Sequence, residues 1–234
     1  MSGQLILDDG TTVTLRRTAR ARRMTLRVSG RDGAVTLTLP PRLPEAEARA
    51  FLSERSAWLK RAMQGVVPAA AVEFGAALPV EGRALVLTPA PVRRPQIDGH
   101  ALLLPATRPA AVTAAAFLRT LAQARLTDAS DRHAATLGRS FRAIALRDTR
   151  SRWGSCTHDG RLMYSWRLAM APPPVLDYVA AHEVAHLAHM DHSAQFWRAV
   201  GGLCPDYPQH RGWLRQHGGA LHRWQFRADS PRGN

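Results

Sequence analysis

The sequence contains one lysine, two cysteines and no long apolar run among its 234 residues. Two cysteines, Cys156 and Cys204, cannot form the multiple disulfides that hold small secreted domains together. No stretch approaches the roughly 18 apolar residues that span a membrane. The N-terminus has no basic segment followed by an apolar one, so we expect no secretory signal. These absences predict a cytoplasmic protein with no membrane partner.

Because Lys60 is the single lysine, arginine supplies nearly all of the positive charge behind the net charge of +14. Arginine-rich usage can reflect the coding bias of a GC-rich genome, and it also favours binding to polyanions such as nucleotides or nucleic acid. The densest patch runs from Arg16 to Arg23. An alternative role for this run is a charged strand edge that prevents aggregation.

One motif stands out: His182-Glu183-Val184-Ala185-His186. On a helix, His182 and His186 lie four residues apart and project from the same face. That spacing lets two imidazoles bind one Zn²⁺ at about 2.0–2.1 Å. Glu183 projects in another direction and is suited to act as the base for a water on the ion. The sequence therefore predicts a zinc site with Glu183 as the catalytic residue.

A catalytic zinc site needs a third protein ligand and an open fourth position. If the helix stops near Met190 and the chain turns back, His192 can supply that ligand. His189 lies nearer the face of the pair, but one straight helix does not readily direct three side chains to one ion. We favour His192 over His189.

The first part of the chain reads as strands with one helix. Alternating residues predict a hairpin over 4–15 and a second hairpin that joins 24–28 to 35–39. Helical spacing predicts a helix over 44–63, and further strands follow at 72–74, 78–80, 85–87 and 102–104. We expect residues 1–105 to form an N-terminal β-rich part.

The second part, residues 106–225, is expected to be catalytic and mainly helical. A helix over 107–136 should be capped by Gly138, and Pro172–Pro174 should begin the zinc helix. Residues 150–168 resemble a strand pair on which a peptide could add as another strand. A helix after Ser193, a loop at 204–207 and a short helix from Trp213 come next, and residues 226–234 should fray.

In order along the chain, these motifs resemble the YgjP-like metallopeptidase domain, a relative of the SprT-like zinc peptidases. The resemblance covers roughly residues 16–217 and is carried by Arg152–Cys156, Trp166–Leu168, His182–His186 and His189–Ser193. It implies a zincin-like α+β fold, with the HExxH helix packed on a small antiparallel sheet. It also implies Zn²⁺ on His182, His186 and His192, with Glu183 catalytic.

The expected reaction is hydrolysis of a peptide bond in a peptide or protein by a water that zinc binds and Glu183 activates. Arg150, Arg152, Trp153 and Tyr207 are candidate substrate-binding residues. Tyr207, His210 and Arg211 are candidates to stabilise the oxyanion, and Cys156 is expected to be a small buried residue rather than a ligand.

Two other functions stay open at this point. The same site could hydrolyse a phosphoanhydride, as a nucleotide pyrophosphatase in which Arg150 and Arg152 hold the phosphates. Alternatively, the chain could be a DNA-associated SprT-like module, in which case binding to DNA should weaken steeply with salt.

Overall fold

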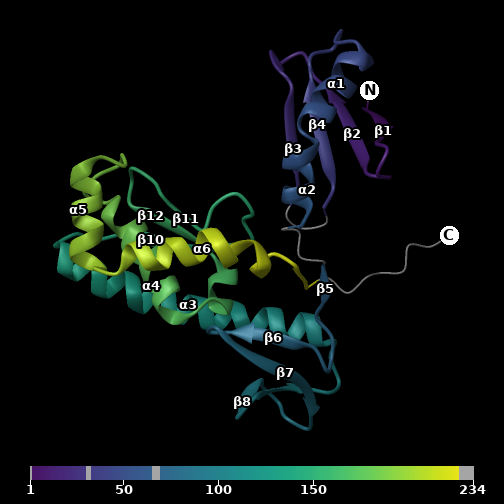
Figure 1. Ribbon diagram of the computed structural model, residues 1–234. Coiled ribbons are helices and arrows are strands. Elements are labelled where there is room, and N and C mark those ends of the chain that lie inside the picture. Colours follow the sequence, from purple (N-terminus) through teal and green to yellow (C-terminus); the bar gives the residue numbers. More distant parts are fainter. Residues whose placement is uncertain (1, 30–32, 65–68, 227–234) are drawn as a thin grey trace. The chain divides into compact units, whose positions relative to one another are not determined.

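The computed structural model describes residues 2–29, 33–64 and 69–226 of the chain. The chain divides into two compact units, Met1–Ala70 and Ala71–Asn234 (Figure 1). The sequence placed the boundary of the β-rich part at residue 105. In the structure, the strands between residues 77 and 105 share the core of the second unit, because their buried leucines pack with those of its helices.

The first unit is one four-stranded sheet with two helices. Its elements are β1 (Ser2–Ile6), β2 (Thr12–Arg17), β3 (Thr25–Val28), β4 (Val35–Leu39), α1 (Glu45–Glu54) and α2 (Ser56–Gln64). The strand order is β1-β2-β4-β3, with β2 parallel to β4 and the other pairs antiparallel. Both predicted hairpins are confirmed, and the turn residue Asp32 of the second lies outside the described residues.

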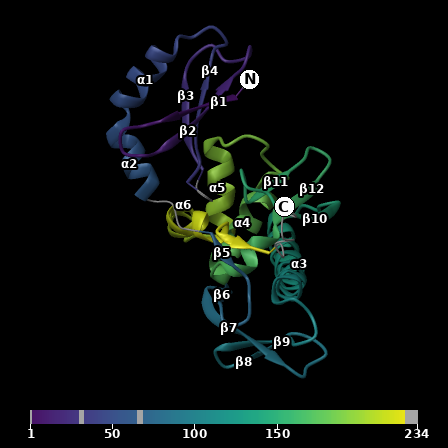
Figure 2. The ribbon, with the colours of Figure 1, turned by 90° about the vertical axis from the view of Figure 1, so that its right-hand side faces the viewer.

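Alternation along the strands gives this sheet one buried face. That face and the two helices contribute Leu5, Val13, Leu15, Val35, Leu37, Leu39, Ala48, Leu52 and Leu59 to one core. Figure 2 shows α1 and α2 along one side of the strands. The prediction of one continuous helix over 44–63 is wrong at Arg55, where the helix breaks; Leu52 before the break and Leu59 after it both reach the core.

The second unit surrounds the long helix α3 (Ala110–Leu137), which ends at Gly138 in the left-handed conformation that the sequence predicted (φ 64°). Before α3 come the short strand β5 (Ala70–Ala71) and a four-stranded sheet of order β6-β7-β9-β8. Those four strands are β6 (Ala77–Val80), β7 (Arg83–Ala90), β8 (Gln96–Asp98) and β9 (Ala101–Pro105). Residues 72–74, predicted as a strand, are not one.

After α3 the chain forms the elements that carry the HExxH motif. These are β10 (Ala143–Arg147), β11 (Gly154–Cys156), β12 (Arg161–Ser165), the 3₁₀ helix η1 (Trp166–Met170), α4 (Pro173–Ala185), α5 (Ala194–Leu203), α6 (Tyr207–Leu221) and β13 (Trp224–Gln225). The sequence predicted a loop at 204–207 and a last helix that begins at Trp213. In the structure this helix, α6, already begins at Tyr207. Of the predicted tail 226–234, residues 227–234 lie outside the described part of the chain.

The sheet beside α4 has the strand order β10-β12-β11. β11 is antiparallel to β12, but β10 is parallel to it, so the sheet is mixed and the prediction of an antiparallel sheet is wrong for β10. Taken together, the structure is an α+β fold. Within the described residues, no helix is long and apolar enough to cross a membrane.

Candidate metal centre

The HExxH motif lies at the end of α4. Pro172 is the N-cap residue and Pro173 begins the helix, where the missing N–H of proline costs nothing. The helix is buried along most of its length against α3, which fixes its rotation. Although α4 ends at Ala185, His186 keeps right-handed helical angles at the C-cap. His182 and His186 therefore project from the same face, as the sequence predicted.

Beyond His186 the chain turns sharply. The backbone N–H groups of Leu187, Ala188 and His189 all donate to carbonyls of the last helical turn. Ser193 then caps α5, with its Oγ accepting from the Phe196 N–H at 3.4 Å. The turn and the cap return His192 to the pair, and nitrogen atoms of His182, His186 and His192 all lie within 4.8 Å of one another.

The spacing of these nitrogens suits a tetrahedral metal. Nε2 of His182 and Nε2 of His192 face each other at 3.3 Å. Two nitrogens bound to one zinc at about 2.0–2.1 Å, at a tetrahedral angle, would lie about 3.3–3.4 Å apart. Nδ1 of His186 donates to the carbonyl of His189 at 2.9 Å, which leaves its Nε2 lone pair available for an ion.

The surroundings also favour the neutral form of the His182 and His186 imidazoles, the form in which histidine binds a metal. Burial, together with the neighbouring His186 and His192, lowers the pKa of His182 to about 3. Burial likewise lowers the pKa of His186. Phe196 holds both rings in place, since it stacks on His186 at 4.4 Å and meets His182 edge-on at 4.9 Å.

Glu183 is only 5% exposed. Burial raises its pKa to about 8, and the positive charge of Arg152 opposes that rise. A divalent cation bound to the three histidines would further favour the carboxylate form that a general base requires.

Gly154 of β11 makes room for that carboxylate. A Cβ atom added at Gly154 would lie 2.5 Å from Oε1 of Glu183 and 2.7 Å from its Cδ. Any side chain at this position would displace Glu183. The sequence analysis included Gly154 in a motif without giving it a role, because this contact joins residues far apart in the chain.

A cavity of about 410 Å³ opens over the site. Its wall is formed by the three histidines, Glu183, Met190, Ser151, Arg152 and the strand Gly154–Cys156. A second, smaller cavity of about 200 Å³ adjoins it, with Arg152, Trp153, His182 and Glu183 in its wall. Arg152 lines both cavities, so it is the permanent positive charge that faces Glu183.

Comparison with protein-family models gives a match over residues 22–217 to the YgjP-like metallopeptidase domain. The chain belongs to the YgjP-like metallopeptidase family. This membership implies a metal ion and a peptide or protein substrate, and the family match spans the three histidines described above.

No curated protein matches this YgjP-like chain. Among solved structures, it is similar to the crystal structure of the metallopeptidase zymogen of Pyrococcus abyssi abylysin. The two are 19% identical, and the similarity covers 38% of this chain and 93% of that one, with a TM-score of 0.35.

The YgjP-like site brings together some of the predicted substrate-binding residues and not others. Arg152 and Trp153 line its cavities, whereas Arg150 and Tyr207 do not. Tyr207 instead stacks between Tyr178 and Trp197, with ring centroids 6.4 and 5.4 Å away.

The other residues that the sequence analysis considered for the site differ in whether they line its cavities. Arg211 lies over the Trp197 ring at 4.7 Å, while His210 lines neither cavity. His189 is outside the metal-binding group and contributes its backbone carbonyl to His186. Cys156, which the sequence predicted to be buried, is only partly buried and lines the cavity. Desolvation raises the pKa of its thiol to about 11, so it stays a neutral thiol.

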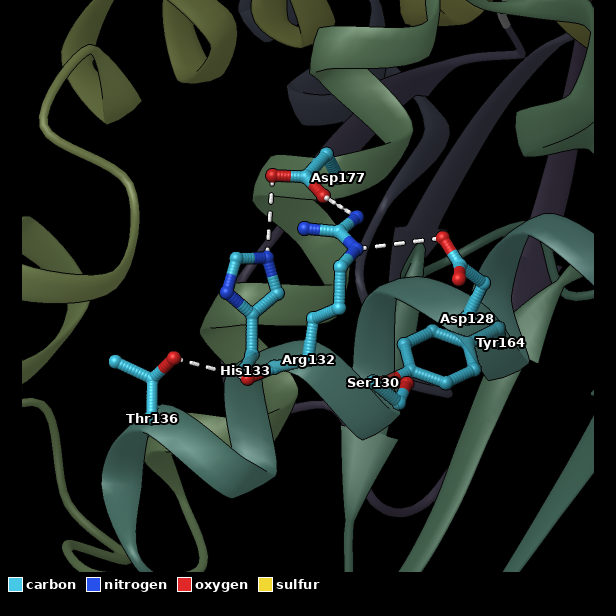
Figure 3. Close-up of polar contacts among 7 residues, drawn as sticks. All are labelled: Asp128, Ser130, Arg132, His133, Thr136, Tyr164 and Asp177. Atoms are coloured by element: carbon cyan, nitrogen blue, oxygen red, sulfur yellow. Dashed lines mark hydrogen bonds and ion pairs between the residues drawn. The ribbon is translucent and has the colours of Figure 1, made fainter.

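Behind the YgjP-like site, a polar network joins α4 to α3 (Figure 3). Asp177 of α4 accepts hydrogen bonds from Arg132 at 2.8 Å and from the buried His133 at 3.1 Å. Burial opposes ionisation of Asp177, but these two hydrogen bonds outweigh it and lower its pKa. Ser130 and Tyr164 are also labelled in Figure 3, and their hydroxyl oxygens form a hydrogen bond of 2.9 Å that joins α3 to β12.

An ion pair between the buried Arg167 and the partly exposed Asp148 anchors the segment that leads to Arg152. Arg167 donates to Asp148 at 2.6 and 3.2 Å and to the carbonyls of Leu221 and Trp224 at 3.0 and 3.1 Å. One guanidinium thus ties η1 to the end of β10 and to the C-terminal end of α6.

The sequence analysis missed Tyr178. It lies one helical turn before His182, on the same face, and lines the smaller cavity beside Glu183. Its hydroxyl makes no hydrogen bond to any residue that the structure describes. Burial raises its pKa to about 12, so the hydroxyl keeps its proton and can donate it. The four-residue spacing to His182 was a signal that could have identified it.

Proposed function

We propose that this YgjP-like protein is a zinc-dependent, zincin-like peptidase. His182, His186 and His192 hold the ion and Glu183 is the general base. The observation that supports this most strongly is the 3.3 Å separation of Nε2 of His182 from Nε2 of His192, with His186 beside them. Zinc in this site would act as a Lewis acid and lower the pKa of a water to about 7.

The role of Glu183 follows from its position. Glu183 lines both cavities and shares the wall of the larger one with all three histidines. Glu183 takes a proton from the attacking water and later passes it to the leaving amine, a role worth about 10²–10⁴-fold in rate. Its low exposure keeps competing water away from the transferred proton.

The substrate carbonyl needs hydrogen-bond donors as its oxygen becomes negative. Tyr178 and Arg152 are suited to this, because both residues line the smaller cavity together with Glu183 and both carry hydrogen-bond donors. We assign oxyanion stabilisation to Tyr178 and electrostatic support to Arg152.

The peptide itself is expected to extend β11. This strand pairs with β12 along one edge, and its residues Gly154, Ser155 and Cys156 line the larger cavity. The free edge of a strand offers backbone N–H and C=O groups to an extended peptide, which gives affinity with little dependence on its sequence.

Metal analysis and hydrolysis of an unfolded protein test the proposal together. The wild type should contain one zinc per chain and cleave the substrate, and a chelator should abolish cleavage. His192→Ala should lose zinc, while the matched variant His189→Ala should keep it. Glu183→Gln should keep zinc and lose about 10³-fold in rate, with Glu81→Gln as the control carboxylate.

Two results would contradict the proposal. Full zinc occupancy in His192→Ala would remove the ligand assignment. Phosphate or pyrophosphate release from nucleoside triphosphates, lost in Glu183→Gln and without any peptide cleavage, would assign the site to phosphoanhydride hydrolysis instead.

A further inference from the structure

The sheet of the first unit has one face that its own helices do not cover. Apart from Ile6 at the end of β1, the described side chains that alternate with the buried ones are threonines, arginines and a glutamine: Gln4, Thr12, Thr14, Arg16, Thr25, Arg27, Thr36 and Thr38. Figure 2 shows both helices on the other side of these strands. This uncovered face is therefore polar and carries positive charge.

Charge is strongly segregated within the unit. Residues 10–44 contain eight arginines and one acidic residue, Asp32. The helical part, residues 45–64, contains four basic and three acidic residues. The two other acidic residues of the strands and loops, Asp8 and Asp9, lie in the turn between β1 and β2, at the opposite end of β2 from the β2–β3 loop. A coding bias towards arginine would raise the basic content of every part, but it does not explain why Asp32 is the one acidic residue of the sequence between residues 10 and 44.

The strand topology gathers the arginines at one end of the sheet. β2 and β4 are parallel, so both end at the same edge, and β3 begins there because Thr25 pairs with Thr38. The loop from β2 to β3 carries Arg20, Arg22 and Arg23 at this edge, and all three are exposed. We call these three, together with Arg16 and Arg27, the basic surface.

The arginines of the basic surface are not used to hold the fold. None of the five forms an ion pair with any residue in the described ranges 2–29, 33–64 and 69–226. By contrast, Arg17 donates to the carbonyls of Pro41 and Leu43 at 2.9 and 2.7 Å. Two exposed guanidinium groups on the polar face and three more in the loop at its end, none paired with an acidic residue of the described ranges, present a surface complementary to a polyanion.

We infer that the basic surface binds double-stranded nucleic acid through its phosphates. Both aromatic residues of the unit, Phe51 and Trp58, belong to its helices, so the face offers no ring on which unpaired bases could stack. Binding by phosphate contact alone favours the duplex, which has the higher charge density. A membrane surface fits less well, since Ile6 is the single large exposed apolar side chain on the described part of this face.

Fluorescence anisotropy of the full chain with a labelled duplex of about 25 base pairs tests this inference, over about 50–200 mM salt. The wild type should bind with little sequence preference and with affinity that falls steeply with salt. Arg16→Gln/Arg27→Gln should lower the log–log salt slope by about 2 and weaken binding about tenfold. Arg20→Gln/Arg22→Gln/Arg23→Gln should weaken it further.

The matched control is Lys60→Gln/Arg61→Gln, which removes the same charge from α2 and should change affinity less than about twofold. If the control and Arg16→Gln/Arg27→Gln lose equal affinity for the duplex, net charge alone would explain the binding. That result would overturn the assignment to the basic surface. So would equal or tighter binding to a single strand of the same length, or binding to anionic lipid vesicles without binding to the duplex.

Cleavage of a short free peptide separates this inference from the proposed peptidase. Arg16→Gln/Arg27→Gln should cleave that peptide at the wild-type rate while losing affinity for the duplex. Absence of duplex binding by an active wild-type enzyme would overturn the inference and leave the peptidase standing.

Discussion

In the first unit, Arg16 and Arg27 extend from the open face of a sheet and form no ion pair with any residue that the structure describes. In the second unit, Arg132 and Arg167 lie against Asp177 and Asp148 and connect one element to another. The same side chain is therefore left free in one region and fixed by its neighbours in the other. Substituting a fixed residue should cost stability or catalysis, whereas substituting a free one should affect only the binding of a ligand.

Alanine substitution of one glycine in each unit should show the widest contrast. Gly154→Ala should displace the Glu183 carboxylate, which lies 2.5 Å from the added Cβ, and reduce peptide hydrolysis about 10³-fold. Gly3→Ala, in β1, meets no atom within 4 Å and should leave the rate unchanged. Steady-state kinetics on zinc-loaded protein measures both, and normal activity of Gly154→Ala would show that Glu183 is not held as described.

Tyr178 extends the comparison of fixed and free side chains to a tyrosine of the second unit, because its hydroxyl forms no hydrogen bond with any residue that the structure describes. Tyr178→Phe should lower kcat about 10²-fold with little change in KM or stability, since the hydroxyl has no partner in the described fold. Tyr164→Phe removes a hydroxyl that is bonded to Ser130 and should instead lower the melting temperature. If Tyr178→Phe loses stability but not kcat, its hydroxyl is structural.

Arginine substitutions test the contrast directly. Arg167→Gln leaves Asp148 and two backbone carbonyls without their donor and should cost about 1.5–3 kcal/mol in unfolding free energy. Arg27→Gln should change that free energy by less than about 0.5 kcal/mol. Denaturant unfolding measures both, and similar values for the two would remove the distinction between fixed and free arginines.

The smallest expected effect is the change in unfolding free energy at acid pH that comes from Asp177. Hydrogen bonds lower the pKa of Asp177 below its unfolded value of about 3.9, so its contribution is complete above that pH and is lost as pH falls through the folded pKa. Asp177→Asn should cost about 1–2 kcal/mol at pH 7 and lose less stability below about pH 4 than the wild type. Glu47→Gln, an exposed side chain of α1, should leave the acid dependence unchanged.

The sequence predicted the local geometry around the HExxH motif. The pairing of His182 with His186 depends only on helical spacing, and the helix ends at Pro173 and Gly138 follow from the conformations of proline and glycine. The approach of His192 also needed a turn whose position the sequence suggested but did not fix. Tyr178 was predictable by the same spacing, yet its place in an apolar stripe concealed it.

Contacts between distant residues were not predictable in this way. Nothing near Gly154 in the sequence indicates that Glu183 will occupy the space of its missing side chain. Alternating apolar residues fix which face of a strand is buried but not which strand lies beside it, so the parallel pairs β2–β4 and β10–β12 were missed. Ion pairs such as Arg167–Asp148 join segments whose separation carries no periodic signal.

The return of His192 to His182 has a practical consequence. The imidazoles at the two ends of the segment 182–192 face each other, so a metal ion bound to both would hold the two ends of this segment together. The ion would then stabilise the fold in addition to its role in hydrolysis. Occupancy should then appear as heat resistance, with a melting temperature that climbs with free zinc in the wild type and stays flat in His192→Ala. Thermal melts would thus report on the metal before any substrate is known.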